Sequence, residues 1–178
     1  MRLFFFIAVL IVLSGCKEPE ARRPVSVKTG TFFDESVARN KKMLQREEEA
    51  IQTIMAKDTL HTYYASPNGF WYYYEEKEPA NAYTPQKDDL VFIHYNLRTL
   101  HNSTLYTTDE IGNRNVKIDS EIIFPGLNAG VKLMKKGETV TFLFPSSLAY
   151  GYPGDGDKIG INVPLMSTVT LIDIIKNP

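Results

Sequence analysis

The chain has 178 residues, 43% of them hydrophobic, and a formal net charge of −1 at pH 7. This size suffices for one domain with a core plus an extension, but not for two full domains. The near-neutral charge and the lack of clustered Lys and Arg exclude the usual nucleic-acid-binding proteins, because phosphate binding needs a basic surface.

Residues 1–15 are typical of a secretory signal peptide. Arg2 precedes an apolar run over 3–13, which is shorter than the about 20 residues that a membrane-spanning helix needs. The run leads into Leu13-Ser14-Gly15-Cys16, which resembles the lipidation motif of bacterial lipoproteins, and Cys16 is the single cysteine of the chain. We therefore expect lipidation of Cys16 and a membrane-anchored protein of the cell envelope that faces the periplasm or the exterior. Lys17 after the cysteine favours the outer membrane.

A tether and a helix are expected next. Residues 16–33 contain Pro19 and Pro24 without apolar periodicity, which is typical of a flexible tether. Asp34 or Ser36 can then cap a helix over 34–58. This helix can pack on the core of its own chain, or it can form an oligomer or bind a partner, and the sequence favours neither. Its apolar residues form one narrow stripe, Val37, Leu44, Ile51 and Met55.

Residues 59–178 predict one domain made mostly of antiparallel strands. The aromatic run over 70–74 favours a strand buried on both faces rather than a stacking surface, because no basic residues lie beside it. Alternating apolar residues predict further strands over 90–99, 116–118, 138–144 and 166–175, with extended chain at Leu105 and Tyr106. In the last strand Val169, Leu171 and Ile175 share one face.

A short helix and one strand organise the second half of this domain. Leu127, Val131 and Met134 recur at helical spacing, and the helix is expected to end by Gly137. The strand over 138–144 alternates apolar and polar residues, so we expect it to be half-buried. Pro145 ends that strand and places Tyr150 on the following turn, beside a glycine-rich loop over 151–160. A tyrosine in this position is well placed to face a ligand.

Motifs for metal, nucleotide or nucleophilic chemistry are missing from the sequence. The chain has three histidines, and no two of them have the helical spacing of a metal site. It also lacks a nucleophile elbow, a phosphate-binding loop and a dinucleotide fingerprint. We therefore expect neither a cofactor nor a metal.

Several segments together resemble FKBP-type peptidyl-prolyl isomerases. They occur in the order of that family and cover the folded domain: 89–95, Ile123-Phe124-Pro125-Gly126-Leu127, 145–151, Val163-Pro164 and 168–174. The resemblance implies an α+β fold with an FKBP-like curved antiparallel β-sheet around a short α-helix, preceded by an N-terminal helix. The lipidation motif, the preceding helix and the aromatic strand further resemble the FKBP lipoproteins linked to gliding motility in Bacteroidetes.

The resemblance also implies a pocket for a proline ring and the chemistry around it. It gives catalytic roles to Tyr150, whose hydroxyl donates to a substrate carbonyl, to Tyr95, and to Phe124, whose N–H anchors the chain. It adds binding residues at Ile123, Leu127, Val163, Leu171, Leu105 and Tyr106. The family usually has Trp at the position of Leu127, Phe-Asp at Leu105-Tyr106 and Phe at Leu171.

Two functions follow from this resemblance. The first is an isomerase that acts on proline-containing polypeptides and assists the folding of exported or cell-surface proteins, with a link to gliding motility. The second is a non-catalytic binding module of a cell-envelope, gliding or secretion assembly. The residues that depart from the family, Leu127 and Tyr106, favour the second function, whereas Tyr95, Phe124 and Tyr150 favour the first.

Overall fold

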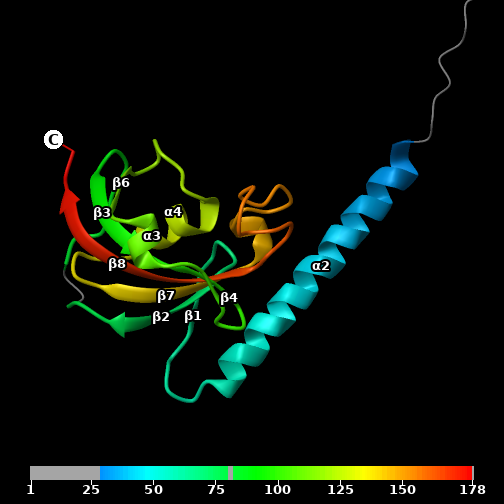
Figure 1. Cartoon of the computed structure of the whole chain (residues 1–178), viewed down its shortest axis with the longest axis horizontal. Helices are drawn as coiled ribbons and strands as arrows, with labels where there is room; N and C mark the ends of the chain where they lie inside the picture. The colour runs from blue at the N-terminus through cyan, green and yellow to red at the C-terminus, as the bar shows by residue number, and fades with distance from the viewer. Residues whose placement is uncertain (1–28, 80–81, 178) are drawn as a thin grey trace, which may run out of the picture. The chain divides into compact units, whose positions relative to one another are not determined.

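The computed structural model describes residues 29–79 and 82–177, with side chains from Phe33 onward (Figure 1). The predicted signal peptide, Cys16 and most of the predicted tether therefore lie outside the described residues. The chain forms two compact units, Met1–Ser36 and Val37–Pro178. Among the described residues, no helix has a stretch both long and apolar enough to cross a membrane.

Helix α2, Thr29–Lys57, extends across the boundary between the two units. The predicted cap at Asp34 or Ser36 is wrong, because both residues lie inside this helix. Asp and Ser favour caps only when the backbone before them is not helical, and here the preceding turn continues the helix. Residues 29–33, which the sequence assigned to the tether, belong to this helix.

One eight-stranded antiparallel sheet organises the second unit. Its strands follow the order β1-β2-β7-β8-β3-β6, and β4 pairs with both β8 and β5. Three short helical segments accompany the sheet: α3 (Thr108–Ile111), α4 (Pro125–Val131) and the 3₁₀ helix η1 (Ser146–Leu148). The strands are β1 (Tyr64–Ala65), β2 (Trp71–Glu76), β3 (Leu90–Tyr95), β4 (Leu97–Thr99), β5 (Thr104–Tyr106), β6 (Arg114–Lys117), β7 (Thr139–Phe144) and β8 (Leu165–Ile175). The predicted α+β class is confirmed.

Helix α4 covers one face of the sheet, which we call the front face. Leu127 and Val131 of α4 belong to the larger core cluster, together with Phe142 and Phe144 of β7. A side chain at Gly126 would come within 2.5 Å of the Phe144 ring and 2.7 Å of the Leu148 carbonyl oxygen. Only glycine therefore allows α4 to lie this close to β7.

The opposite face of the sheet, the back face, is covered as well. Thr141 and Leu143 of β7 point to this face, and both are 0% exposed. The prediction of a half-buried strand is therefore wrong. Alternation of apolar and polar residues indicates which face of a strand is buried in its own sheet. It cannot show that a helix distant in sequence covers the other face.

Local irregularities account for the other differences from the predicted elements. The expected strand over 90–99 is interrupted at Asn96, whose side-chain Oδ1 accepts the Thr168 N–H at 3.0 Å. In β8 a register shift opposite Phe92 and Ile93 inserts one extra residue. This bulge reverses the alternation, so that Ile174 packs on the core and Ile175 is 52% exposed, contrary to the prediction for Ile175.

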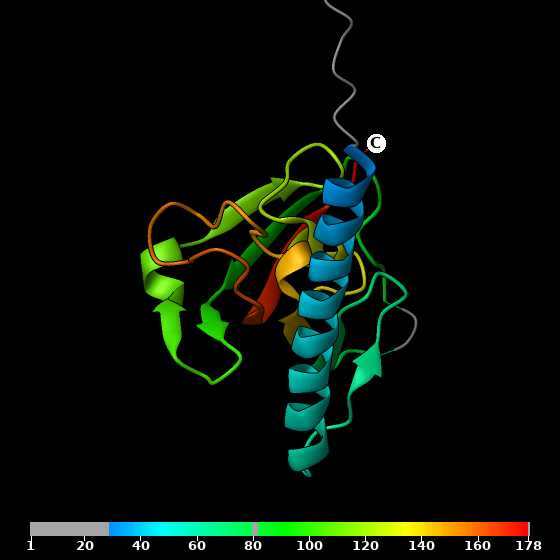
Figure 2. The ribbon, with the colours of Figure 1, turned by 90° about the vertical axis from the view of Figure 1, so that its right-hand side faces the viewer.

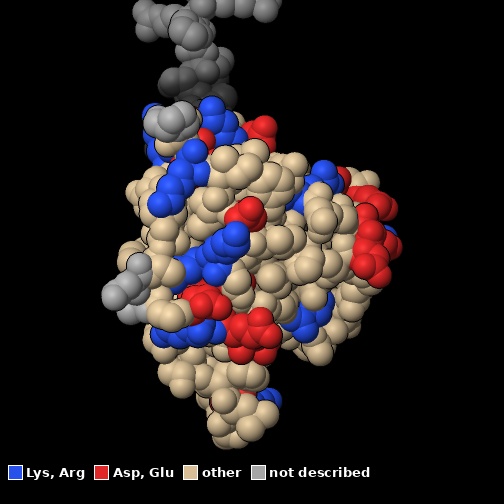
Figure 3. Space-filling model, turned by 90° about the vertical axis from the view of Figure 1, so that its left-hand side faces the viewer, with Lys and Arg blue, Asp and Glu red and all other residues tan. Residues whose placement is uncertain are grey.

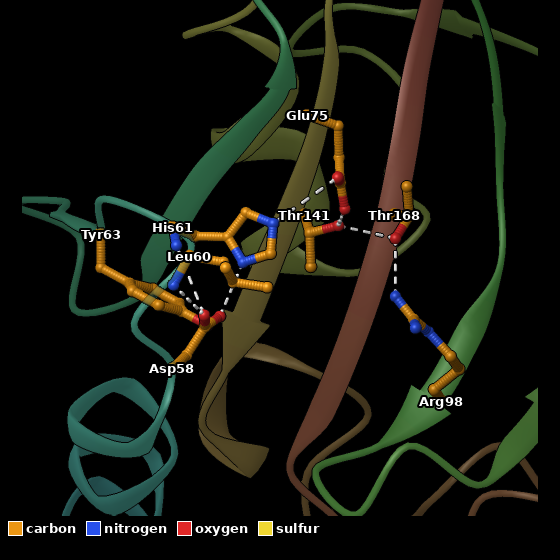
Figure 4. Close-up of polar contacts among 8 residues, drawn as sticks. All are labelled: Asp58, Leu60, His61, Tyr63, Glu75, Arg98, Thr141 and Thr168. Atoms are coloured by element: carbon orange, nitrogen blue, oxygen red, sulfur yellow. Dashed lines mark hydrogen bonds and ion pairs between the residues drawn. The ribbon is translucent and has the colours of Figure 1, made fainter.

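A polar stripe crosses the back face over four strands (Figure 4). It consists of hydrogen bonds from Arg98 Nη2 to Thr168 Oγ1 (2.6 Å), between the Thr168 and Thr141 hydroxyls (2.7 Å), and from Thr141 Oγ1 to Glu75 Oε1 (3.1 Å). The hydroxyl of the buried Thr141 therefore has hydrogen-bond partners on both sides, the Thr168 hydroxyl and the Glu75 carboxylate.

The C-terminal end of α2 is fixed beside this stripe. Asp58 accepts hydrogen bonds from the Leu60 N–H (2.9 Å) and the Tyr63 hydroxyl (2.8 Å), and its Oδ2 lies 2.7 Å from His61 Nδ1 (Figure 4). The hydrogen bond from His61 is the largest of the contacts that lower the pKa of Asp58 to about 2. His61 also stacks on Tyr73 of β2, with ring centres 4.1 Å apart. These contacts hold the end of α2 on the back face.

The apolar stripe of α2 packs on the sheet over only part of its length. Ile51 is 0% exposed and packs in a second core cluster with Tyr73, Leu100, Leu143 and Met166. Val37, which the sequence placed on the same stripe, is 49% exposed. Packing on the same chain therefore accounts for the later turns of α2.

Charged side chains of both signs are interspersed on the face drawn in Figure 3. The surface ion pairs of the described residues include Lys132 with Asp119 at 2.9 Å and Lys136 with Asp173 at 2.6 Å. Exposed pairs of this kind contribute little to stability, so the fold rests on its two core clusters.

Ile51→Ala tests the docking of α2. We expect the free energy of unfolding to fall by about 2–5 kcal/mol, because the change removes a fully buried side chain and leaves a cavity. Guanidinium unfolding would measure this loss. Val37→Ala, at an exposed position of the same helix, is the control and should change stability by less than about 0.5 kcal/mol. Equal effects of the two substitutions would contradict the docked helix.

Candidate active site

Two adjoining hollows lie where the ends of several strands and loops meet. They share three lining residues, Tyr95, Arg114 and Tyr150. The first hollow, of about 340 Å³, is also lined by Asn115, Val116, Glu121, Ile122 and Ile123. The second, of about 220 Å³, is also lined by Leu97, Tyr106, Glu110, Ile111 and Asp155. The two tyrosines and Arg114 therefore stand between two spaces that mix apolar and polar walls.

The two shared tyrosines present hydroxyl groups to these hollows. Tyr95 is the last residue of β3 and is 4% exposed, and Tyr150 is partly buried. Burial is the main cause that raises the pKa of Tyr150, and the charge of Asp155 raises it further. Burial also raises the pKa of Tyr95 to about 12. The positive charge of Arg114 opposes both increases. Both phenols therefore stay protonated at neutral pH. Neither hydroxyl bonds another of the described residues, so both can donate to a ligand.

The segment before Tyr150 fixes its position. Pro145 ends β7, and η1 follows directly. The Ser146 carbonyl accepts the N–H groups of Ala149 (3.1 Å) and Gly151 (3.0 Å), which flank Tyr150 on both sides. Gly151 has φ +61°, a conformation that glycine adopts without strain. The tyrosine is thus held on a tight turn and not on a free loop.

Phe124 packs against Tyr150 and is the N-cap residue of helix α4. Its ring is 2% exposed and lies 5.3 Å from the Tyr150 ring and 5.4 Å from the Phe144 ring. As the N-cap of α4, Phe124 has an extended backbone. Among the described residues no group accepts a hydrogen bond from its N–H, which leaves this donor for a ligand.

The predicted site residues fall into three groups in the structure. Tyr95, Tyr150, Ile123 and Tyr106 line the hollows. Leu105 and Val163 are partly buried and pack against the core without lining either hollow. Phe124 lies beneath Tyr150, and Leu127 and Leu171 are 0% exposed. Leu127 lines a separate small cavity of about 10 Å³, which it shares with Ile123 and Val116 of the first hollow.

Tyr106 is turned toward the glycine-rich loop. Its hydroxyl donates to Asp155 Oδ2 at 2.6 Å and lies 3.1 Å from Asp157 Oδ2. The hydrogen bond to Asp155, followed by burial, raises the pKa of Tyr106 to about 12. Asp155 Oδ1 also accepts the N–H groups of Asp157 and Ile159. Burial alone would raise the pKa of Asp155, but the bonds from Tyr106 and these two N–H groups outweigh burial and lower it.

Sequence reasoning missed the residues that α3 brings to the site. Thr107 and Glu110 form a capping box, in which each side chain bonds the backbone N–H of the other. This Thr-x-x-Glu pattern was visible in the sequence and could have located the helix. Glu110 also pairs with Lys158 at 2.7 Å, which links α3 to the glycine-rich loop. Arg114 follows on β6, and its side chain forms no hydrogen bond or ion pair with another of the described residues.

The structure offers no arrangement for metal chemistry in the part of the chain that it describes. No group of three or more His, Cys, Asp or Glu residues in this part is placed to hold an ion. The hollows present the phenols of Tyr95 and Tyr150, the guanidinium of Arg114 and the carboxylates of Glu110, Glu121 and Asp155 beside apolar walls.

Comparison with known proteins gives one family match. The family model described as FKBP-type peptidyl-prolyl cis-trans isomerase matches residues 81–172. FkpA of Neisseria meningitidis is 35% identical over 101 residues, which are 57% of this chain and 37% of that protein. Human FKBP9 is 32% identical over 123 residues, which are 67% of this chain and 19% of that protein. The chain thus spans less than half the length of these curated relatives.

Two crystal structures share the fold. FkpA from Escherichia coli matches with a TM-score of 0.59 at 19% identity and covers 100% of this chain and 84% of its own. A peptidyl-prolyl cis-trans isomerase from Pseudomonas syringae matches with a TM-score of 0.58 at 22% identity and covers 76% of this chain and 96% of its own. The predicted fold of a sheet around a short helix, with a helix before it, is confirmed.

Tyr106→Phe tests the bond between β5 and the glycine-rich loop. We expect a lower free energy of unfolding at pH 7, because ionised Asp155 loses its shortest hydrogen bond. Folding lowers the pKa of the Asp155 carboxyl from its unfolded value of 3.8, so this carboxyl stabilises the folded state fully above that value. The stabilisation is lost as the pH falls through the lower pKa of the folded state. The difference from wild type should therefore shrink in urea unfolding from pH 7 to about pH 2.5.

The matched control for this prediction is Tyr152→Phe, since Tyr152 is 75% exposed on the same loop. It should leave stability unchanged at both pH values. A loss in Tyr106→Phe that stayed constant with pH would show that Asp155 is not the partner that matters.

Proposed function

The chain belongs to the family of FKBP-type peptidyl-prolyl cis-trans isomerases, and we propose that its folded part catalyses rotation about the peptide bond that precedes proline. Amide resonance makes this rotation slow, with a barrier of about 18–20 kcal/mol. A site accelerates it by binding the twisted amide better than either planar form. No metal, cofactor or charged acid is needed for such a step. The substrates we propose are proline-containing polypeptides.

The hollows around Tyr95 and Tyr150 suit this reaction. Ile122, Ile123 and Val116 give one hollow an apolar wall that can take a proline ring. An apolar surface also removes water that stabilises the planar, more dipolar amide. The observation that carries the proposal is the Tyr150 hydroxyl, which stands between the hollows, stays protonated and has no partner among the described residues. It can donate to a carbonyl that flanks the proline, and the Phe124 N–H can hold a second carbonyl.

A binding module without turnover is the second candidate. It is favoured by Leu127, which stands where the family usually has Trp and is 0% exposed beside a small cavity of about 10 Å³. The hollows accordingly have no indole platform beneath the proline ring. Such a site would hold a proline-containing segment through the same donors without favouring the twisted amide.

We further propose that the protein works at the cell envelope, where it assists the folding of exported or surface proteins. The support is the sequence motif Leu13-Ser14-Gly15-Cys16 and the single cysteine of the chain. Lipidated Cys16 would anchor the protein, and Lys17 favours the outer membrane. A role in a gliding or secretion assembly is the most specific form of this proposal.

Tyr150→Phe tests the isomerase. We expect kcat/KM on a short Xaa-Pro peptide to fall by about 2- to 13-fold, which corresponds to one neutral hydrogen bond of about 0.5–1.5 kcal/mol. A protease-coupled assay or NMR exchange between the cis and trans peptide would measure it. Tyr152→Phe should retain full activity. If wild type bound the peptide but gave only the uncatalysed rate, the binding module would replace the enzyme.

Cys16→Ala tests the anchor. In a bacterial host the full chain should incorporate labelled palmitate and enter the detergent phase on phase partitioning, and the variant should do neither, because the acyl chains attach to this thiol. Western blotting of membrane fractions would follow both proteins. A wild-type chain that stayed unlabelled would remove the lipoprotein proposal and leave the isomerase proposal untouched.

A further inference from the structure

Helix α2 contacts the segment that carries Tyr150 through one buried carboxylate. Glu47 is 8% exposed, and Ser146 at the start of η1 is 1% exposed. Glu47 Oε2 accepts the Ser146 N–H at 2.8 Å, and Glu47 Oε1 accepts the Ser146 hydroxyl at 2.7 Å. A carboxylate is costly to bury, and hydrogen bonds to both oxygens offset that cost. This contact is therefore a specific feature of the fold and not a passing surface pair.

Ser146 connects this carboxylate to Tyr150. Its N–H and hydroxyl bond Glu47, while its carbonyl accepts the N–H groups on either side of Tyr150, those of Ala149 and Gly151. The donors of Ser146 thus bond α2, while its carbonyl acceptor bonds the turn that carries Tyr150. A shift of Ser146 would move the backbone of Tyr150 with it.

The helix can hold Ser146 because α2 is itself fixed at two further points. Ile51, one turn beyond Glu47, is 0% exposed in the second core cluster. At the helix end, Asp58 and His61 attach the chain to the back face beside Glu75 (Figure 4). Figure 2 shows α2 running past the segment that contains η1. These two points of attachment, both C-terminal to Glu47, make Glu47 a rigid support.

We propose that Glu47 is a positioning residue for Tyr150, and that the turns of α2 around it are part of the isomerase unit. This inference rests on the proposed function and adds a residue to it. The domain expected from the sequence begins at residue 59, and the family model matches only from residue 81, so both leave Glu47 outside. The structural unit that begins at Val37 includes it.

The size of the effect follows from the mechanism. Without the carboxylate, the Ser146 N–H and hydroxyl are buried without a partner, and η1 shifts to find new ones. Catalysis then loses the aligned Tyr150 hydroxyl. If Glu47 acts through Tyr150 alone, Glu47→Ala cannot cost more than Tyr150→Phe. We therefore expect kcat to fall by no more than about 13-fold, with little change in KM.

A double-mutant cycle on the full chain tests the inference. Isomerase rates would be measured for wild type, Glu47→Ala, Tyr150→Phe and the double variant. We expect Glu47→Ala to cost almost nothing further in the Tyr150→Phe background, because both changes remove the same interaction. Additive losses would overturn the proposal and leave Glu47 a structural residue. Glu49→Gln, an exposed acid on the same helix, is the control and should match wild type.

A second readout keeps the test decisive if Glu47→Ala does not fold. Ser146→Ala removes only the 2.7 Å hydroxyl bond and keeps the N–H bond, so it should fold and give a smaller loss of the same kind. Glu47→Gln keeps the size of the side chain and removes its charge. Fluorotyrosine at position 150 should shift or broaden its ¹⁹F resonance in Ser146→Ala and Glu47→Gln and not in Glu49→Gln. An unchanged resonance in Ser146→Ala and Glu47→Gln would refute the positioning role.

Failure of the proposed function gives a different result. A wild-type chain without turnover on any Xaa-Pro peptide would refute the isomerase, and with it a role of Glu47 in catalysis. A resonance at position 150 that still responded to Glu47→Gln would then show that the carboxylate positions Tyr150 for binding.

Discussion

The burial of both faces of the central strands β7 and β8 is the constraint on which the structure depends. Phe142 and Phe144 pack on the front face under α4, while Leu143 and Met166 pack on the back face with Ile51 of α2. Burial of apolar area is the main favourable contribution to folding, and here one strand contributes to two clusters at once. The cost is that every polar group on β7 needs a partner, which Thr141 finds in Thr168 and Glu75.

These covered strands position the residues of the candidate site. Tyr95 is the last residue of β3, and Tyr150 follows the end of β7 on a turn whose carbonyl and N–H groups are bonded. Groups on the ends of rigid elements are held more precisely than groups on long loops. The glycine-rich loop is long, but two contacts attach it to neighbouring elements: Asp155 bonds Tyr106 of β5, and Lys158 pairs with Glu110 of α3.

The sequence predicted the order and type of most strands and the α+β class, because periodicity along a segment reports how that segment is buried. It also predicted, through the family resemblance, that Tyr95 and Tyr150 lie near each other. It could not predict the full burial of Leu143, the position of Ile175 or the place of Glu47. Those depend on a helix distant in sequence and on a bulge set by the pairing of β3 with β8, which no single segment encodes.

The small cavity beside Leu127 limits how the core below the hollows can be changed. At about 10 Å³ it is much smaller than the difference in volume between the side chains of leucine and tryptophan. A single Leu127→Trp substitution would therefore overpack this part of the core. The residue that is usual in the family fits here only together with a smaller companion residue among the neighbours of Leu127.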